Sequence, residues 1–97
     1  MSEEEASRLH AIIHGRVQGV GFRAFVIDKG IAIGVTGWAR NKWDGTVEVI
    51  AEGEHQQLEQ LLTALHRGPS MANVTQVDVD WQTAKGEFSS FHVRSTF

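Results

Sequence analysis

The chain has 97 residues, of which 41% are hydrophobic, so we expect one domain with a small core. Its formal net charge of −3 argues against a general nucleic-acid binder or a protein that coats an anionic membrane. The absence of cysteine excludes disulfides, thiolate catalysis and cysteine-ligated metals, and it suits a reducing compartment. No apolar run has the length of a membrane span and the N-terminus is acidic, so we expect no signal peptide and a cytoplasmic location.

The chain begins with a polar stretch that gives way to an alternating apolar pattern. Residues 1–7 are polar and acidic, and we expect a flexible tail there, ahead of a single domain at residues 8–97. The alternating residues that follow are Leu9, Ala11 and Ile13. This period predicts a strand with one strongly buried face.

A glycine-rich segment, Gly15–Arg23, follows this strand. Its glycines permit positive φ angles and let a ligand approach the backbone closely. A loop that bends just before a helix gathers N–H groups at the positive end of the helix dipole, where an anion can bind. Arg23 adds a guanidinium group that stays charged at physiological pH. A tight turn that simply needs glycine is the alternative interpretation, and the position of Arg23 favours a phosphate site.

The stretch after this segment has the pattern of a helix. One helical face is shared by Phe22, Phe25, Val26, Lys29 and Ile33. Gly34 is placed to end the helix as its C-terminal cap. Gly30 lies inside the helix and weakens it by about 0.5–1 kcal/mol relative to alanine. If the helix leaves room for a methyl group, Gly30→Ala should stabilise the protein by about 0.4–1 kcal/mol.

Two further strands and a tight turn follow the first helix. Val35–Arg40 and Thr46–Glu52 have strand patterns, and the Asp44-Gly45 pair between them is typical of a hairpin turn. A hairpin in this place would bring Asn41 beside the glycine-rich loop if the first and third strands are neighbours.

The rest of the chain predicts a helix and two strands. The apolar stripe of the helix consists of Leu58, Leu61, Leu62 and Leu65. Gly68-Pro69 ends this helix, and strand patterns follow at residues 74–82 and 91–96. The order βαββαβ with a terminal strand is typical of the ferredoxin-like split βαβ sandwich, an α+β fold whose antiparallel sheet carries two helices on one face.

Other motifs near these segments are excluded. Gly19–Ala24 fits the dinucleotide fingerprint, but 97 residues cannot hold the two βαβ halves of that fold. Asp78 and Asp80 look like a catalytic pair, but their alternation with apolar neighbours places them on the wet face of a strand. His10 and His14 lie roughly 13 Å apart along one strand and cannot share a metal. We therefore expect no metal site.

Taken together, these segments resemble the acylphosphatase family. The resemblance rests on Gly15–Arg23, Gly34–Asn41, Asp44–Glu48, Gly68-Pro69 followed by Ala72 and Val74, and Phe91–Arg94. It covers nearly everything from Leu9 to Phe97 and keeps the spacing between the segments. The chain departs from the family at Trp43, where proline is frequent, and at Gly30, where alanine is usual.

The resemblance implies a ferredoxin-like fold and the hydrolysis of acyl phosphates to carboxylate and inorganic phosphate without a cofactor. It also implies that the catalytic residues are Arg23 and Asn41. The phosphate-binding residues that it implies are Val17, Gln18, Gly19, Val20, Gly21, Phe22 and Arg23.

These residues suit the chemistry of an acyl phosphate. Its leaving group is a carboxylate whose conjugate acid has a pKa of roughly 4, so the reaction needs no general acid. Asn41 offers a donor and an acceptor and does not titrate, so it can orient the attacking water.

We therefore expect a monomeric enzyme that acts on a small acyl phosphate, with inorganic phosphate as product and inhibitor. No nucleic-acid or membrane partner is expected. Two alternatives stay open: a non-catalytic anion- or partner-binding module of the same fold, and a small RNA-binding domain. The second lacks a basic face and an exposed aromatic strand signature.

Overall fold

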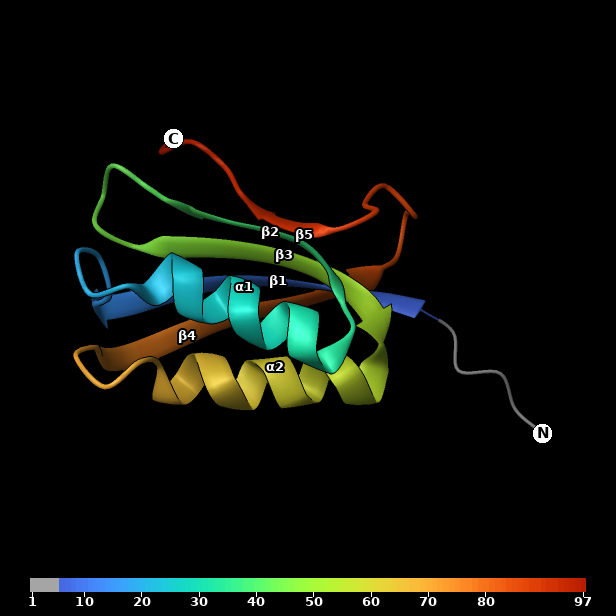
Figure 1. The fold of residues 1–97 in the computed structure, drawn as a ribbon, viewed down its shortest axis with the longest axis horizontal. Helices are drawn as coiled ribbons and strands as arrows, with labels where there is room; N and C mark the ends of the chain where they lie inside the picture. The colour runs from blue at the N-terminus through green and yellow to red at the C-terminus, as the bar shows by residue number, and fades with distance from the viewer. Residues whose placement is uncertain (1–5) are drawn as a thin grey trace.

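Two helices cover one face of a five-stranded sheet in the computed structural model, which describes residues 6–97 (Figure 1). The elements in chain order are β1 (Ala6–Arg16), α1 (Phe22–Ile33), β2 (Thr36–Asn41), β3 (Val47–Glu54), α2 (His55–Arg67), β4 (Asn73–Thr83) and β5 (Phe91–Val93). This order confirms the predicted ferredoxin-like plan. β1 begins at Ala6, within the stretch predicted as a tail, and the first five residues of that tail lie outside the described residues.

The strands lie in the order β4-β1-β3-β2-β5, so β3 separates β1 from β2 as predicted. β1 pairs antiparallel with β3 and β4, and β2 pairs antiparallel with β3. β5 pairs in parallel with β2, so the sheet is mixed rather than wholly antiparallel as expected. β5 is also shorter than predicted, but the N–H groups of Arg94 and Phe97 still bond to the carbonyl oxygens of Ala39 and Asn41.

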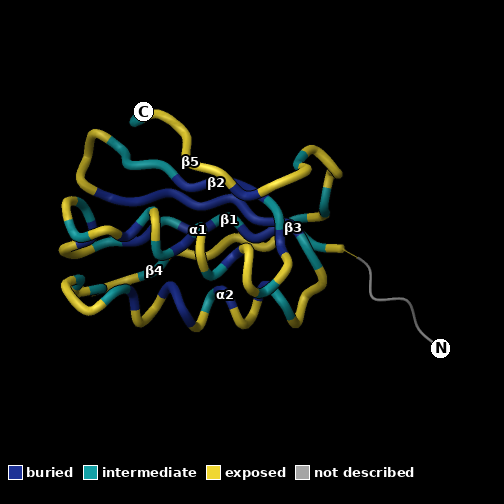
Figure 2. The backbone as a smooth tube through the Cα atoms, in the orientation of Figure 1, coloured by how far each residue is buried: buried dark blue, intermediate teal, exposed yellow. Residues whose placement is uncertain are grey.

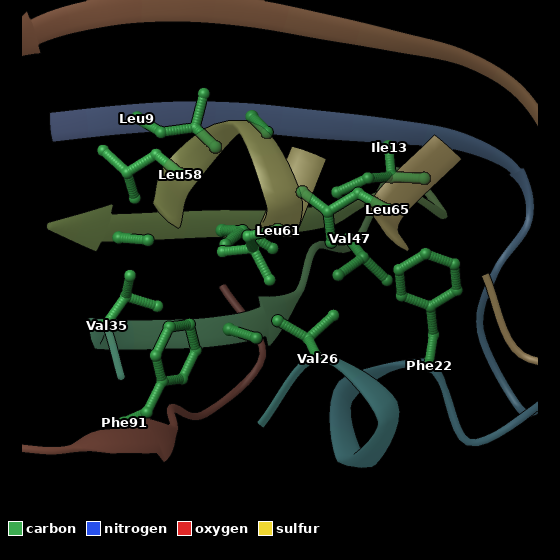
Figure 3. Close-up of a cluster of buried hydrophobic side chains, with 14 of the residues drawn as sticks. Leu9, Ile13, Phe22, Val26, Val35, Val47, Leu58, Leu61, Leu65 and Phe91 are labelled. Carbon is green, nitrogen blue, oxygen red and sulfur yellow. The ribbon is translucent and has the colours of Figure 1, made fainter. Parts of the chain in front are cut away.

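The core fills the space between the helices and the inner face of the sheet (Figures 2 and 3). Side chains with no exposed surface include Leu9, Ala11, Ile13, Val26, Val47, Val49, Leu58, Leu61 and Leu65. Burying a side chain of the size of leucine stabilises the fold by about 1.5–3 kcal/mol, so this layer supplies much of the stability. Phe22, the first residue of α1, belongs to the same layer and anchors the end of the glycine-rich loop in the core.

The other face of the sheet carries ion pairs next to Asn41. The side chain of Arg40 donates to Glu48 at 2.8 Å, and the ring nitrogen Nε2 of His10 lies 2.7 Å from the other carboxylate oxygen. The guanidinium of Arg40 also lies over the Phe97 ring, 4.4 Å from its centroid. This cluster ties the end of β2 to the central strands and to the C-terminal segment.

Gly30 lies in α1 against the ring of Phe91, and this packing leaves no room for a methyl group. A β-carbon at Gly30 would lie 2.6 Å from Cδ2 of Phe91, which is itself buried. Overpacking costs about 1–3 kcal/mol, which exceeds the gain in helix propensity of about 0.5–1 kcal/mol. We therefore expect Gly30→Ala to lower the free energy of unfolding, measured in urea, by about 1–2 kcal/mol.

The control for this variant is a second substitution that removes the ring. In a Phe91→Leu background, Gly30→Ala should cost much less than it does in the parent protein. A stabilisation by Gly30→Ala in the parent protein would contradict the packing argument and restore the expectation drawn from helix propensity.

The pKa of Glu48 makes stability depend on acid pH. Burial raises this pKa, but hydrogen bonds from Arg40 and His10 outweigh burial and hold it below the ordinary value of 4.5. A carboxyl with a depressed pKa stabilises the fold fully above its unfolded pKa, and that stability is lost as the pH falls through the folded pKa. Glu48→Gln should therefore lower stability at pH 7 and weaken its decline below pH 4.5.

The measurement is urea unfolding at several pH values between neutrality and the acid range. Glu59→Gln removes a carboxylate from an exposed helix position and is the matched control. An equal change in pH dependence for both variants would assign the effect to net charge. Part of the acid sensitivity should persist in Glu48→Gln, because the pKa of Glu52 is lowered as well.

Candidate active site

The loop between β1 and α1 spans residues 17–21 and depends on two glycines with positive φ. The angle is 74° at Gly19 and 79° at Gly21, a region that other residues rarely adopt. A β-carbon at either position would meet no heavy atom within 4 Å, so conformation rather than crowding requires glycine. The same open space lets a ligand approach the backbone of the loop.

The start of α1 has no side-chain cap from any residue in 6–97. Gly21 is the N-cap residue, and the first turn holds no acidic side chain. In contrast, α2 begins with a capping box in which the Glu54 N–H donates to the side chain of Gln57 at 3.0 Å. The first N–H groups of α1 therefore meet no carboxylate at the positive end of its dipole.

A pocket of about 300 Å³ lies at this helix start. Its walls are formed by Val17, Gly19, Gly21, Phe22, Arg23, Ala24, Asn41 and Val93. The pocket brings together the loop, Arg23 and Asn41 because the β1–α1 loop and the β2–β3 turn lie at the same end of the molecule (Figure 1). Sequence reasoning missed Val93, since nothing in a three-residue strand indicates that it pairs with β2.

Arg23 is the second residue of α1 and lies half-buried in the pocket wall. No carboxylate of residues 6–97 forms an ion pair with it. A cation at the positive end of a helix is unfavourable unless an anion binds there. The local electrostatics therefore favour a bound anion beside Arg23.

Asn41 is the last residue of β2 and lines the pocket. Its backbone is held on both sides, because it pairs with Val47 of β3 and its carbonyl oxygen accepts the N–H of Phe97 at 3.1 Å. No side chain or backbone group of the described residues forms a hydrogen bond with its side-chain amide. The amide is thus fixed at its base and available to a molecule in the pocket.

Of the residues predicted to bind phosphate, Gln18, Val20 and Phe22 have side chains that are held by other parts of the protein. The Gln18 side chain bonds to the β2–β3 turn, while Val20 packs against the core and the ring of Phe22 lies within it. Only the backbone N–H groups of these residues are therefore candidates for contact with an anion. Sequence patterns place such residues in a loop, but they do not show where each side chain points.

No histidine, aspartate or glutamate is among the residues that line this pocket in the described part of the chain. Within residues 6–97, no three His, Cys, Asp or Glu side chains are grouped so that they could hold a metal ion. None of the helices in the same range is long and apolar enough to cross a membrane.

Comparisons with known proteins identify the family of this chain. A sequence model of the acylphosphatase family matches residues 9–93. An acylphosphatase of Pelotomaculum thermopropionicum is 46% identical over 87 residues, which cover 90% of this chain and 95% of the relative. An acylphosphatase of Salinibacter ruber is 51% identical over 87 residues, with 90% and 92% covered.

A solved structure gives the same result for the fold. The crystal structure of acylphosphatase from Bacillus subtilis superposes with a TM-score of 0.88 at 33% identity and covers 91% of this chain and 98% of its own. The chain belongs to the acylphosphatase family.

Proposed function

We propose that this protein hydrolyses acyl phosphates to a carboxylate and inorganic phosphate by direct attack of water. The observation that carries the proposal is the pocket that is lined by glycines of the loop, by Arg23 and by Asn41. Family membership supports the same reaction.

The phosphoryl group binds at the start of α1. Backbone N–H groups of residues 17–22 and the guanidinium of Arg23 contact its oxygens, and the helix dipole adds to their field. These donors are held in place before the substrate arrives, so they can stabilise charge that shifts during the reaction.

Asn41 orients the attacking water in line with the bond that breaks. Its amide can donate to and accept from one water molecule, and it stays uncharged at every pH of interest. The pocket lining carries no acid or base among the described residues, and a carboxylate leaving group needs none. The substrate that suits this site is therefore a mixed anhydride rather than a phosphate ester.

A monomer in the cytoplasm is the form that we propose. The roles in the proposed mechanism are filled by Arg23, Asn41 and the loop N–H groups, so the mechanism does not call for a residue from a second copy. The cysteine-free sequence is compatible with a reducing compartment.

Substitutions at the two proposed catalytic residues should have different effects. Arg23→Lys keeps a charge but loses the bidentate fork, so both phosphate affinity and turnover should fall, turnover by about 100-fold or more. Asn41→Ala should abolish most turnover and leave phosphate affinity within about three-fold, because Asn41 contacts water. Steady-state hydrolysis of benzoyl phosphate and competitive inhibition by phosphate measure the two quantities.

The matched control is Arg67→Lys at the end of α2, outside the pocket, which should alter neither quantity. Asn41→Asp should be as inactive as alanine, since a carboxylate there lacks the amide donor and repels the phosphate. Near-normal turnover with lost phosphate binding in Asn41→Ala would show that the two roles are exchanged. Phosphate binding without turnover in the parent protein would indicate a binding module instead of an enzyme.

Hydrolysis should also be independent of added metal and selective for the leaving group. The roles assigned to Arg23 and Asn41 require no divalent cation, so the rate with benzoyl phosphate should be unchanged in excess chelator. An alkyl phosphate monoester should be a poor substrate, because an alkoxide departs slowly without a general acid. Activity that disappears with chelator and returns with a divalent metal would overturn the mechanism.

A further inference from the structure

The side chain of Gln18 joins the loop between β1 and α1 to the turn that follows Asn41. Its Nε2 donates to the carbonyl oxygen of Lys42 at 2.7 Å and to that of Thr46 at 2.9 Å. We infer that Gln18 is a positioning residue that sets the distance between the bound phosphoryl group and the water held by Asn41. This inference rests on the proposed function.

The turn that accepts these bonds, residues 42–46, is held together by hydrogen bonds of its own. The Lys42 N–H donates to the carbonyl oxygen of Thr46 at 2.9 Å, and the Gly45 N–H donates to that of Lys42 at 3.1 Å. The Asp44 carboxylate also accepts from the backbone N–H and the hydroxyl of Thr46, at 3.0 and 2.6 Å. The Trp43 N–H ties the turn to the carbonyl oxygen of Phe97 at 3.2 Å, while the two bonds from Gln18 fix its position relative to the loop after β1.

No other hydrogen bond links the two segments within residues 6–97. The β1–β3 ladder ends at the pair Ile13 and Val47, and the loop at residues 17–21 lies beyond it. The β2–β3 ladder likewise ends at Asn41 paired with Val47, just before the turn. The loop and the turn therefore lie beyond the β1–β3 and β2–β3 ladders, and the carboxamide of Gln18 spans the gap between them.

Both N–H hydrogens of the carboxamide are engaged, which makes the contact specific for glutamine. Asparagine is shorter by one methylene and cannot reach both carbonyl oxygens. Glutamate has nearly the same shape, but its carboxylate has no hydrogen to donate and would face two carbonyl oxygens. Protonation would restore one donor to this glutamate.

Steady-state kinetics of Gln18→Ala and Gln18→Glu test the inference, with benzoyl phosphate as substrate and inorganic phosphate as inhibitor. Because a shift of about 1 Å can cost a factor of about 100, we expect kcat to fall by about 10- to 100-fold in both variants. Phosphate inhibition should stay within about three-fold, since the loop N–H groups and Arg23 are unchanged. In Gln18→Glu, kcat relative to the parent should rise as the pH is lowered.

A double-mutant cycle with Asn41→Ala distinguishes positioning from a general loss of order. If Gln18 acts through Asn41, adding Gln18→Ala to Asn41→Ala should reduce kcat by less than about three-fold further. The control is Gln57→Ala, which removes another glutamine that bridges two elements by donating to the Ile33 carbonyl at 3.1 Å. That variant should lower the melting temperature and leave kcat unchanged.

Three outcomes would overturn the inference. Unchanged kcat in Gln18→Ala would show that the turn is placed without this side chain. A parallel loss of phosphate affinity would assign Gln18 to ordering the phosphate loop instead, and full additivity with Asn41→Ala would remove the link to that residue. If Asn41→Ala alone keeps normal turnover, the proposed function fails at Asn41 whatever Gln18 does.

Discussion

An uncapped helix start beside a guanidinium is the constraint on which the rest of the site depends. Gly21, with φ at 79°, ends the loop so that α1 begins without a side-chain cap from residues 6–97. Arg23 adds a full positive charge to the positive end of the same helix. The helix start and the guanidinium are unfavourable neighbours unless an anion lies beside them, so together they favour the binding of a phosphate.

The order of the strands brings Asn41 to the proposed anion site. β1 and β2 both run antiparallel to β3, which lies between them, so they point in the same direction. The end of β2 and the loop after β1 therefore lie at the same end of the sheet. Asn41 stands at that end, and the backbone bond from Phe97 holds it from the other side. The proposed site therefore depends on tertiary structure, because Asn41 and the loop after β1 meet only when β1 and β2 both pair with β3.

Local patterns predicted the elements well, because each was encoded within a few residues. The leucines of α2 and the Asp44-Gly45 turn are examples, since period and turn chemistry act over short distances. Gly30 shows the limit: helix propensity is local, but the ring of Phe91 that fills its space comes from a distant strand. The position of Val93 in the pocket and the direction of the Gln18 side chain depend in the same way on tertiary contacts.

A domain of this size can hold such a site because the core itself fixes the donors. Val17 begins the loop and Phe22 follows it, and the two residues are only 1% and 2% exposed. Hydrophobic packing therefore fixes the loop backbone at both ends. Donors fixed in this way need little reorganisation when charge shifts on the phosphoryl oxygens. The hydrolysis of an acyl phosphate needs no general acid in addition, since its carboxylate departs without a proton. The selectivity proposed for mixed anhydrides therefore follows from rigid donors combined with a pocket lining that, in the described residues, offers no acid to a poorer leaving group.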